Sequence, residues 1–282
     1  MENSIYPCIW FDGNALEAAE LYCSAFADAT IRSTNPVVVI FEIMGKKFMG
    51  LNGGANYRPN ASISFSITCR STEELDMAWK LLIKDGQTLM PIDQYPWSDR
   101  YGWLQDKYGV SWQLTLGSPG QVTLPDAFPS LLFTGEQNGK AEAAINFYTS
   151  LFENSKVELI ARYQANEHDI EDHIKFALFT IDGQKLSVMD SSQNHDLKFN
   201  PGISFVVNCE TQEEIDYLWL NLTEGGREDR CGWCQDVFGV SWQIVPTILG
   251  QLMSDPQKAP KVVEAFMKMT KFNIQELKDA AL

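Results

Sequence analysis

Tyr101-Gly-Trp-Leu-Gln-Asp-Lys-Tyr-Gly-Val-Ser-Trp-Gln-Leu-Thr115 recurs later in the chain as Cys231-Gly-Trp-Cys-Gln-Asp-Val-Phe-Gly-Val-Ser-Trp-Gln-Ile-Val245. Nine of the fifteen positions are identical, at a constant offset of 130 residues (231 − 101). An internal repeat of this kind determines the domain count before any single element is assigned. In a chain of 282 residues it predicts two domains, each of roughly 130 residues.

Each copy has the pattern of a β-hairpin, with apolar and aromatic residues on both arms around an Asp-x-x-Gly turn. The turns are Asp106 to Gly109 and Asp236 to Gly239. Because side chains alternate along a strand, the polar residues of each second arm share one face and the apolar residues share the other. The polar positions are Ser111 and Gln113 in the first copy, and Ser241 and Gln243 in the second. We expect the apolar face to pack on helices, and the glutamines either to satisfy hydrogen bonds at the sheet surface or to contact a ligand.

The segments around the hairpins also recur in the same order. The first copy predicts strands at 5–11 and 63–69, a hairpin turning at Gly45, helices at 15–26 and 71–84, and a strand-like segment at 87–91 followed by a loop to Arg100. The second copy is shorter in one place: 23 residues separate Trp79 from Gly102 (102 − 79), whereas 13 separate Trp219 from Gly232 (232 − 219). This deletion should open one wall of the second domain or allow another segment to fill it.

These patterns give the domain boundaries. We assign a first domain to residues 1–117, a linker rich in proline and glycine to 118–127, a second domain to 128–250 and a helical tail to 251–282.

The composition limits the partners. The net charge of −15 disfavours nucleic acid and anionic membrane as binding partners, because proteins approach both through clustered lysine and arginine. The first residues carry no basic region or apolar run, so no signal peptide is expected, and no apolar run is long enough to span a membrane. The six scattered cysteines suggest reduced thiols, and together these features predict a cytoplasmic protein. The Cys231-x-x-Cys234 pair lies on a predicted strand, which favours incidental core cysteines over a redox or zinc motif.

The chain resembles the vicinal oxygen chelate superfamily, which includes glyoxalase I, bleomycin-resistance proteins and extradiol dioxygenases. Within it, the chain is similar to the PhnB-like group, often labelled demethylubiquinone methyltransferase-like. The resemblance is carried by Pro7-Cys-Ile-Trp-Phe11, by Glu142-Ala-Ala-Ile-Asn-Phe-Tyr148, by the two hairpins and by the tail from Met267 to Leu282. It implies an α+β fold with two tandem domains. Each domain would consist of two βαβββ units that form a curved mixed sheet with helices outside, and a C-terminal helical tail would follow.

The resemblance also implies where a metal would bind. The superfamily's last-strand ligand, commonly Glu, corresponds to Gln113 and Gln243, and its first-strand ligand, commonly His, falls near Cys8 and Ser130. Neutral amides are poor ligands for hard cations without anionic or imidazole partners. We therefore expect no tightly bound metal and no cofactor. The methyltransferase label is not supported by a Gly-rich strand–helix loop, because both Gly-Gly pairs have the pattern of turns.

Three functional hypotheses follow. The first is a metal-free protein that binds or sequesters a small apolar or aromatic molecule in a cup, with ligand-binding residues Gln113, Ser111, Trp103, Trp10, Gln243, Ser241 and Trp233. The second is a glyoxalase- or dioxygenase-type enzyme whose divalent-metal site has diverged, for which the sequence identifies no catalytic residues. The third is a scaffold without a small ligand. A homodimer is possible, but the two domains can instead pair within one chain.

Overall fold

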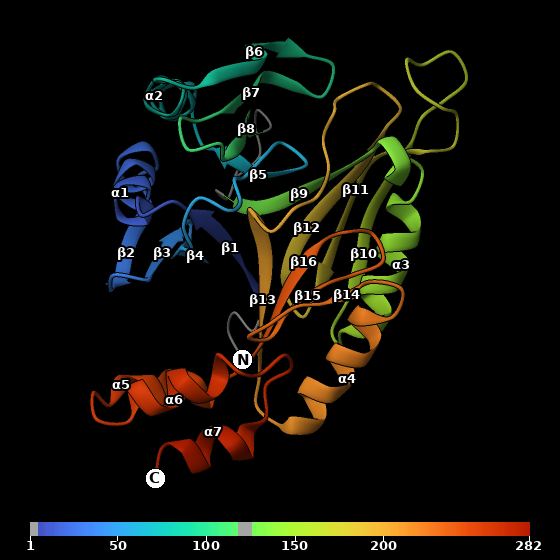
Figure 1. Cartoon of the computed structure of the whole chain (residues 1–282). Helices are drawn as coiled ribbons and strands as arrows, with labels where there is room; N and C mark the ends of the chain where they lie inside the picture. Colours follow the sequence, from blue (N-terminus) through green and yellow to red (C-terminus); the bar gives the residue numbers. More distant parts are fainter. Residues whose placement is uncertain (1–4, 118–125) are drawn as a thin grey trace. The chain divides into compact units, whose positions relative to one another are not determined.

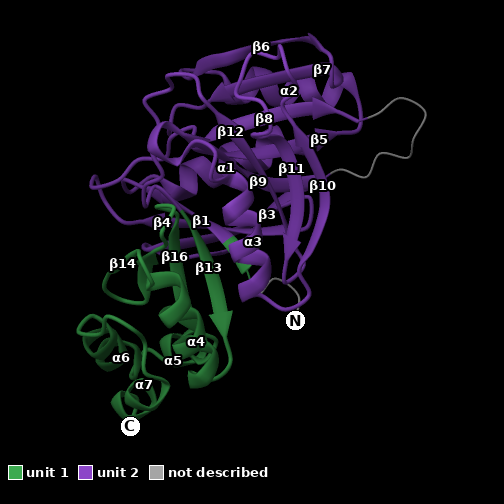
Figure 2. Cartoon of the chain, turned by 90° about the vertical axis from the view of Figure 1, so that its right-hand side faces the viewer, with its two compact units in different colours: residues 1–6, 204–282 green, residues 7–203 purple. Residues whose placement is uncertain are grey.

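The computed structural model describes residues 5–117 and 126–282. The described residues form two compact units: one comprises Pro7–Ile203, and the other combines Ile5 and Tyr6 with Ser204–Leu282. Figure 2 shows them in separate colours. Most of the predicted linker, residues 118–125, lies outside the described residues, and the next strand begins at Asp126.

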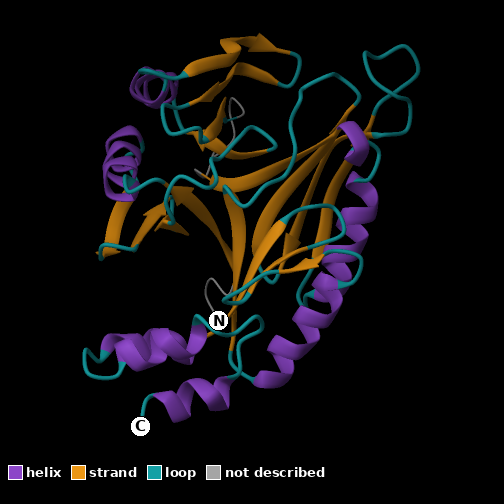
Figure 3. Cartoon of the chain, viewed as in Figure 1, coloured by secondary structure: helices purple, strands orange, loops and turns teal. Residues whose placement is uncertain are grey.

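Four βαβββ modules follow one another along the chain (Figure 1). The first contains β1 (Ile5–Phe11), α1 (Ala15–Ala25), β2 (Ala29–Thr34), β3 (Val38–Ile43) and β4 (Lys46–Asn52). The second contains β5 (Ile63–Cys69), α2 (Thr72–Leu82), β6 (Gln87–Tyr95), β7 (Ser98–Gln105) and β8 (Ser111–Leu116). The third contains β9 (Asp126–Thr134), the 3-10 turn η1 (Gly135–Gln137), α3 (Ala141–Leu151), β10 (Lys156–Arg162), β11 (Ile174–Ile181) and β12 (Gln184–Ser191). The fourth contains β13 (Ile203–Cys209), α4 (Gln212–Thr223), β14 (Arg227–Glu228), β15 (Trp233–Gln235) and β16 (Ser241–Pro246). Helices α5 (Ile248–Ser254), α6 (Ala259–Phe266) and α7 (Ile274–Ala280) form the tail (Figure 3).

This architecture confirms the predicted α+β fold, with mixed sheets, helices packed on them and a helical tail. One sequence prediction is wrong. The segment expected to be a loop before Arg100 is strand, because β6 continues to Tyr95 and only Pro96 and Trp97 connect it to β7. The hairpin therefore extends much further than the apolar pattern of residues 87–91 indicated.

The larger unit contains an eight-stranded sheet in the order β10-β11-β12-β9-β5-β8-β7-β6. Strands β5 and β8 are parallel, as are β9 and β12, and β5 joins β9 in antiparallel pairing. Half of the strands therefore come from each sequence repeat, and the two repeats meet within one chain. One face buries apolar side chains, including Phe65, Trp112, Leu131 and Val188, and helices α2 and α3 contact the strands of this sheet. The opposite face carries the polar residues of the same strands.

The repeated hairpin sequence is explained largely by the carboxylate of Asp106 in the turn. Its Oδ1 accepts hydrogen bonds from the backbone N–H groups of Tyr108 and Val110, at 2.8 and 3.0 Å. Its Oδ2 accepts from Trp112 Nε1 and from the Tyr22 hydroxyl, both at 2.9 Å. In the second hairpin, Asp236 accepts the corresponding backbone bonds and the bond from Trp242 Nε1. The Asp, Gly, Val and Trp of the repeat are thus mainly structural.

In the smaller unit, the tail replaces the strand that the second repeat lacks. Strand β14 has only two residues, which pair with Gln235 and Cys234. Beyond them, the backbone N–H groups of Cys231 and Gly232 donate to the carbonyls of Met269 and Thr270, both at 2.8 Å. The tail therefore bonds to the stretch whose counterpart in the first repeat pairs with β6.

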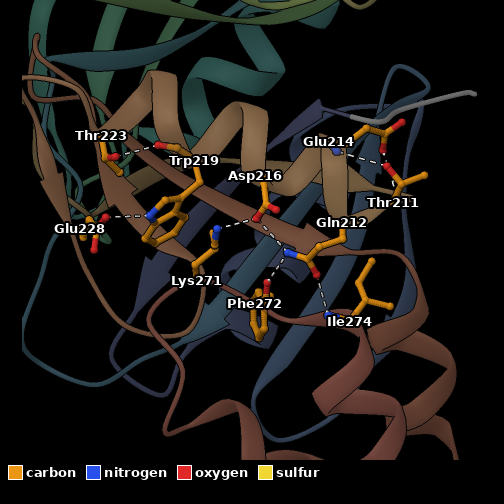
Figure 4. Close-up of polar contacts among 10 residues, drawn as sticks. All are labelled: Thr211, Gln212, Glu214, Asp216, Trp219, Thr223, Glu228, Lys271, Phe272 and Ile274. Atoms are coloured by element: carbon orange, nitrogen blue, oxygen red, sulfur yellow. Dashed lines mark hydrogen bonds and ion pairs between the residues drawn. The ribbon is translucent and has the colours of Figure 1, made fainter.

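Side chains of the tail complete this replacement (Figure 4). The Phe272 ring lies 2.4 Å from where a Cβ on Gly232 would stand, just as Trp79 and Ile92 crowd Gly102 in the first repeat. Gln212 of α4 donates to the Phe272 carbonyl and accepts from the Ile274 N–H, at 3.1 and 2.9 Å. The deletion in the second repeat was expected either to open one wall of the domain or to let another segment fill it. The structure shows the second outcome, because the tail fills the wall.

Candidate functional site

Four neutral polar side chains form a row across the four central strands of the eight-stranded sheet, on the face opposite the buried apolar residues. This hydroxyl–amide row consists of Ser187 on β12, Ser130 on β9, Ser64 on β5 and Gln113 on β8. Gln113 Nε2 donates to Ser64 Oγ at 2.7 Å, and Ser187 Oγ donates to Ser130 Oγ at 2.7 Å. A longer bond, 3.5 Å, links Ser64 Oγ to the Ser130 carbonyl. All four side chains are buried, so the row is a fixed polar strip on the sheet.

Gln113 lies at one end of the row. Its Oε1 accepts a hydrogen bond from the Tyr101 hydroxyl at 2.9 Å, while its Nε2 donates to Ser64. Burial, with a smaller contribution from Tyr95, raises the pKa of Tyr101, so the phenol remains a donor at neutral pH. A side-chain amide has two N–H donors and two acceptor positions, and the protein uses one of each here. One donor and one acceptor of the Gln113 amide therefore take no part in these two hydrogen bonds.

Trp103 and Ser111 lie on the same hairpin as Gln113. Trp103 is directly opposite Gln113 in the β7–β8 register, so the two side chains share a face. The Trp103 Nε1 donates to Ser111 Oγ at 2.7 Å, which fixes the orientation of a half-buried indole. Ser111 itself is fully buried and is a support for Trp103 rather than a surface contact.

The second hairpin repeats only part of this arrangement. Gln243 Nε2 donates to Ser204 Oγ at 3.0 Å, and Ser241 is buried. Trp233 is half-buried and is opposite Gln243 in the register, as Trp103 is opposite Gln113. The position of Tyr101 is taken by Cys231, whose thiol cannot reproduce the phenol's hydrogen bond to the glutamine.

Trp10 lies in a different sheet from Gln113. It is on β1, which pairs with β4, whereas Gln113 lies in the sheet of strands β5 to β12. Its Nε1 donates to the Gly54 carbonyl at 2.6 Å, and its ring would overlap any Cβ on Gly53, at 2.2 Å. Tyr57 packs edge-on against the ring. These contacts fix the Trp10 ring beside the loop that follows β4.

The donor chemistry of the row does not fit a divalent cation. The two positions implied as ligands, Gln113 and Ser130, are neutral, and so are their hydrogen-bonded neighbours Ser64 and Ser187. Binding of hard or borderline cations needs carboxylate, imidazole or thiolate donors. Within residues 5–117 and 126–282, no group of three or more His, Cys, Asp or Glu side chains is arranged to hold a metal ion.

The Cys-x-x-Cys pair has the environment of structural cysteines. Cys234 is buried, and burial raises the pKa of its thiol far above the usual range. Burial also raises the pKa of Cys231, whose Sγ contacts the Phe266 carbonyl and Met267 Sδ in the tail. Both thiols therefore stay protonated at neutral pH, which disfavours nucleophilic chemistry.

The sequence did not indicate two pairs of polar side chains that each include a residue of β12. Lys185, two residues before Ser187, pairs with Asp126 and lies 5.6 Å from the Phe128 ring centroid. Four residues after Ser187, Ser191 Oγ lies 2.9 Å from His195 Nε2. No carboxylate orients His195 in the described part of the chain, so the pair lacks the third member of a catalytic triad. Neither pair has a local sequence signature, because strand register and a loop turn bring the members together.

Comparisons with known proteins bear on the family and the fold of the chain. The family model described as 3-demethylubiquinone-9 3-methyltransferase matches twice, at residues 3–115 and 125–245. A PhnB protein from Bacillus cereus, whose structure carries the same methyltransferase description, is 36% identical over 40% of this chain and 98% of its own, with a TM-score of 0.37. Glyoxalase I from Zea mays is 11% identical over 84% of this chain and 92% of its own, with a TM-score of 0.53, which shows a shared fold. No curated protein matches the chain. No helix among the described residues is long and apolar enough to cross a membrane.

Proposed function

We propose that this chain, which belongs to the family described as 3-demethylubiquinone-9 3-methyltransferase and matches its model twice, binds a small molecule without a metal ion. The ligand lies on the polar face of the eight-stranded sheet, against the hydroxyl–amide row. The observation that carries this proposal is the spare donor and acceptor on Gln113, whose other hydrogen-bonding groups are fixed by Tyr101 and Ser64.

The surroundings of Gln113 support an aromatic or apolar ligand with one polar group. The half-buried Trp103 ring shares its face and is fixed by Ser111, so it offers a rigid surface for stacking. Small-molecule sites typically combine such apolar surface with a few fixed polar groups. A ligand carbonyl or hydroxyl would pair with Gln113 while its apolar part contacts Trp103.

Methyl transfer and metal-dependent chemistry are not part of this proposal. The family's description refers to a methyltransferase, but Gly53 packs against Trp10 after β4, and Gly225 follows α4. Neither glycine pair connects a strand to a following helix, as a nucleotide-binding loop would. The neutral donors of the row give no basis for a Lewis-acid mechanism.

The proposal favours the first hairpin over the second. Tyr101 fixes the Gln113 amide, and Cys231 replaces it in the second repeat. We therefore expect tighter binding at Gln113 than at Gln243.

Tryptophan fluorescence and thermal shift, read against a library of small aromatic and apolar metabolites, test this function. Gln113→Ala should weaken binding of any hit about tenfold or more, because a hydrogen-bonding site that loses its partner discriminates strongly. Gln243→Ala is the matched control and should leave the same affinity within about twofold of wild type, a change under ~0.5 kcal/mol. A library without hits, or equal effects of the two substitutions, would mean that the row is only structural.

A further inference from the structure

The tip of the β6–β7 hairpin forms a pocket of about 530 Å³. Residues 94–99 line it from the hairpin, and Leu116 and Gly117 line it from the end of β8. Its volume lies within the range of roughly 300–1,000 Å³ that is usual for small-molecule sites. None of the residues that line it belongs to the hydroxyl–amide row, and the residues equivalent to the hairpin tip are deleted from the second repeat.

An immobilised indole lies in this pocket. Trp97 is 60% exposed, yet one of its faces stacks on Tyr95, with ring centroids 5.1 Å apart and an interplanar angle of 26°. Tyr101 packs edge-on against the same indole at 5.6 Å. Two tyrosines thus hold the ring in place while its other face remains open. An open aromatic face attracts planar rings and cations.

The pocket also carries a carboxylate without a cationic partner. Asp99 is exposed, and its polar side-chain contact is a long bond of 3.4 Å from Gln94 Nε2. In the described ranges no lysine or arginine pairs with Asp99, because the adjacent Arg100 binds Asp76 at 2.6 Å. The equivalent residue of the second repeat, Asp229, is neutralised by Arg227 at 2.8 Å.

We propose that the hairpin pocket binds a planar organic cation. The ring stacks on the open face of Trp97, and the positive charge lies near Asp99, where the Coulomb attraction and the π-face quadrupole act in the same direction. This site goes beyond the proposed function, since its recognition groups, Trp97 and Asp99, are not members of the hydroxyl–amide row; Tyr101 alone contacts both Trp97 and Gln113. The chain's net charge of −15 adds a general attraction for cations, which the experiment must subtract.

The test uses three probes of similar shape and different charge on the full-length protein. N-Methylquinolinium is a planar cation, quinoline at pH 8 is its neutral analogue, and naphthalene-1-sulfonate is a planar anion. In isothermal titration calorimetry at low salt, we expect saturable binding of the cation and roughly tenfold weaker binding of quinoline. The sulfonate should bind more weakly still.

Point substitutions separate the two contributions. Asp99→Asn should weaken the cation about fivefold and leave quinoline unchanged, since only a charged ligand senses the carboxylate. Trp97→Ala should weaken both about tenfold, and Trp97→Phe should restore part of the loss. Asp229→Asn removes the same charge at the equivalent position of the other repeat, and it should leave cation affinity within about twofold of wild type.

The proposal is overturned if N-methylquinolinium shows no saturable binding at millimolar concentration, or if the three probes bind equally. It is also overturned if Asp229→Asn weakens the cation as much as Asp99→Asn, because the effect would then be net charge alone. Gln113→Ala should not alter cation binding. If Gln113→Ala abolishes cation binding while Trp97→Ala does not, the probe binds at the row and the hairpin pocket is rejected. A metabolite screen without hits would contradict the proposed function at Gln113 but would not change the result expected for the cation.

Discussion

Lys271 of the tail forms an ion pair with Asp216 of α4, as Arg100 of β7 does with Asp76 of α2. The two aspartates occupy equivalent positions of the two repeats, because residues before the deletion are offset by 140 (216 − 76). Their cationic partners come from different parts of the chain. The counterpart of Arg100, Arg230, is retained in the second repeat, but the cation that pairs with Asp216 comes from the tail, which is therefore an integral part of the smaller unit.

The tail's contribution to stability should come from Phe272 rather than from the ion pair. Phe272 is 2% exposed and packs on Gly232, so Phe272→Ala should lower the free energy of unfolding by about 3–5 kcal/mol. Lys271→Ala removes a pair between two partly exposed side chains and should cost at most about 1 kcal/mol. Urea denaturation followed by circular dichroism measures both. Similar losses for the two variants would argue against a packing role for the tail.

The turn glycine of the first hairpin should not tolerate a side chain. Gly109 has a φ of +90°, and a Cβ there would lie 2.8 Å from the Pro59 carbonyl oxygen. Gly109→Ala should therefore destabilise the protein by at least about 1–2 kcal/mol. Gly250, within helix α5, has open space around it and no positive φ. Gly250→Ala is the control and should stabilise by roughly 0.5–1 kcal/mol in the same thermal unfolding assay. A neutral Gly109→Ala would show that the turn relaxes.

The sequence predicted the modules well because hydrophobic periodicity and turn residues are local signals. The strand at Ile63–Cys69 alternates strictly, and Ser71 accepts the Glu74 N–H that its capping pattern predicts. The extension of β6 to Tyr95 was missed because its residues are mostly exposed and lack that alternation.

The candidate site was only partly predictable for the same reason. The polar face of Gln113 follows from strand alternation, but its partners Tyr101 and Ser64 depend on which strands become neighbours. The pairing of β5 with β9, which brings Ser64 next to Ser130, joins segments 66 residues apart and has no local signature.

Metal analysis gives a direct test of the metal-free proposal. Protein purified without added metal should contain well under one equivalent of zinc, nickel or iron, because the row offers only hydroxyl and amide donors. Elemental analysis by mass spectrometry measures this, with a chelator-treated sample as control. A stoichiometric metal that remains bound after dialysis would contradict the metal-free proposal and favour the glyoxalase-type alternative.

The pH dependence of stability should report the buried turn carboxylate. Desolvation raises the pKa of Asp106 to about 6 from its usual 3.8, although four hydrogen bonds from Trp112, Tyr22, Tyr108 and Val110 act in the opposite direction. Between these two pKa values the folded state binds more protons than the unfolded state. The contribution of Asp106 to the free energy of unfolding therefore falls as the pH rises from the lower to the higher of these pKa values, and it is constant at higher pH.

Asp106→Asn isolates the contribution of Asp106 to the pH dependence of stability, because asparagine does not titrate. The contributions of the other ionisable groups largely cancel in the difference in unfolding free energy between wild type and variant. The Asn variant should be less stable than wild type at every pH, since its amide N–H₂ faces donors where the carboxylate accepted bonds. The stability advantage of wild type over the variant should grow by about 1 kcal/mol when the pH is lowered from 7.5 to about 5.2. Exposed Asp12→Asn controls for the loss of one negative charge. Urea midpoints at four pH values measure the trend. An advantage that shrinks at lower pH would mean that the four donors outweigh desolvation and that Asp106 is held ionised in the fold.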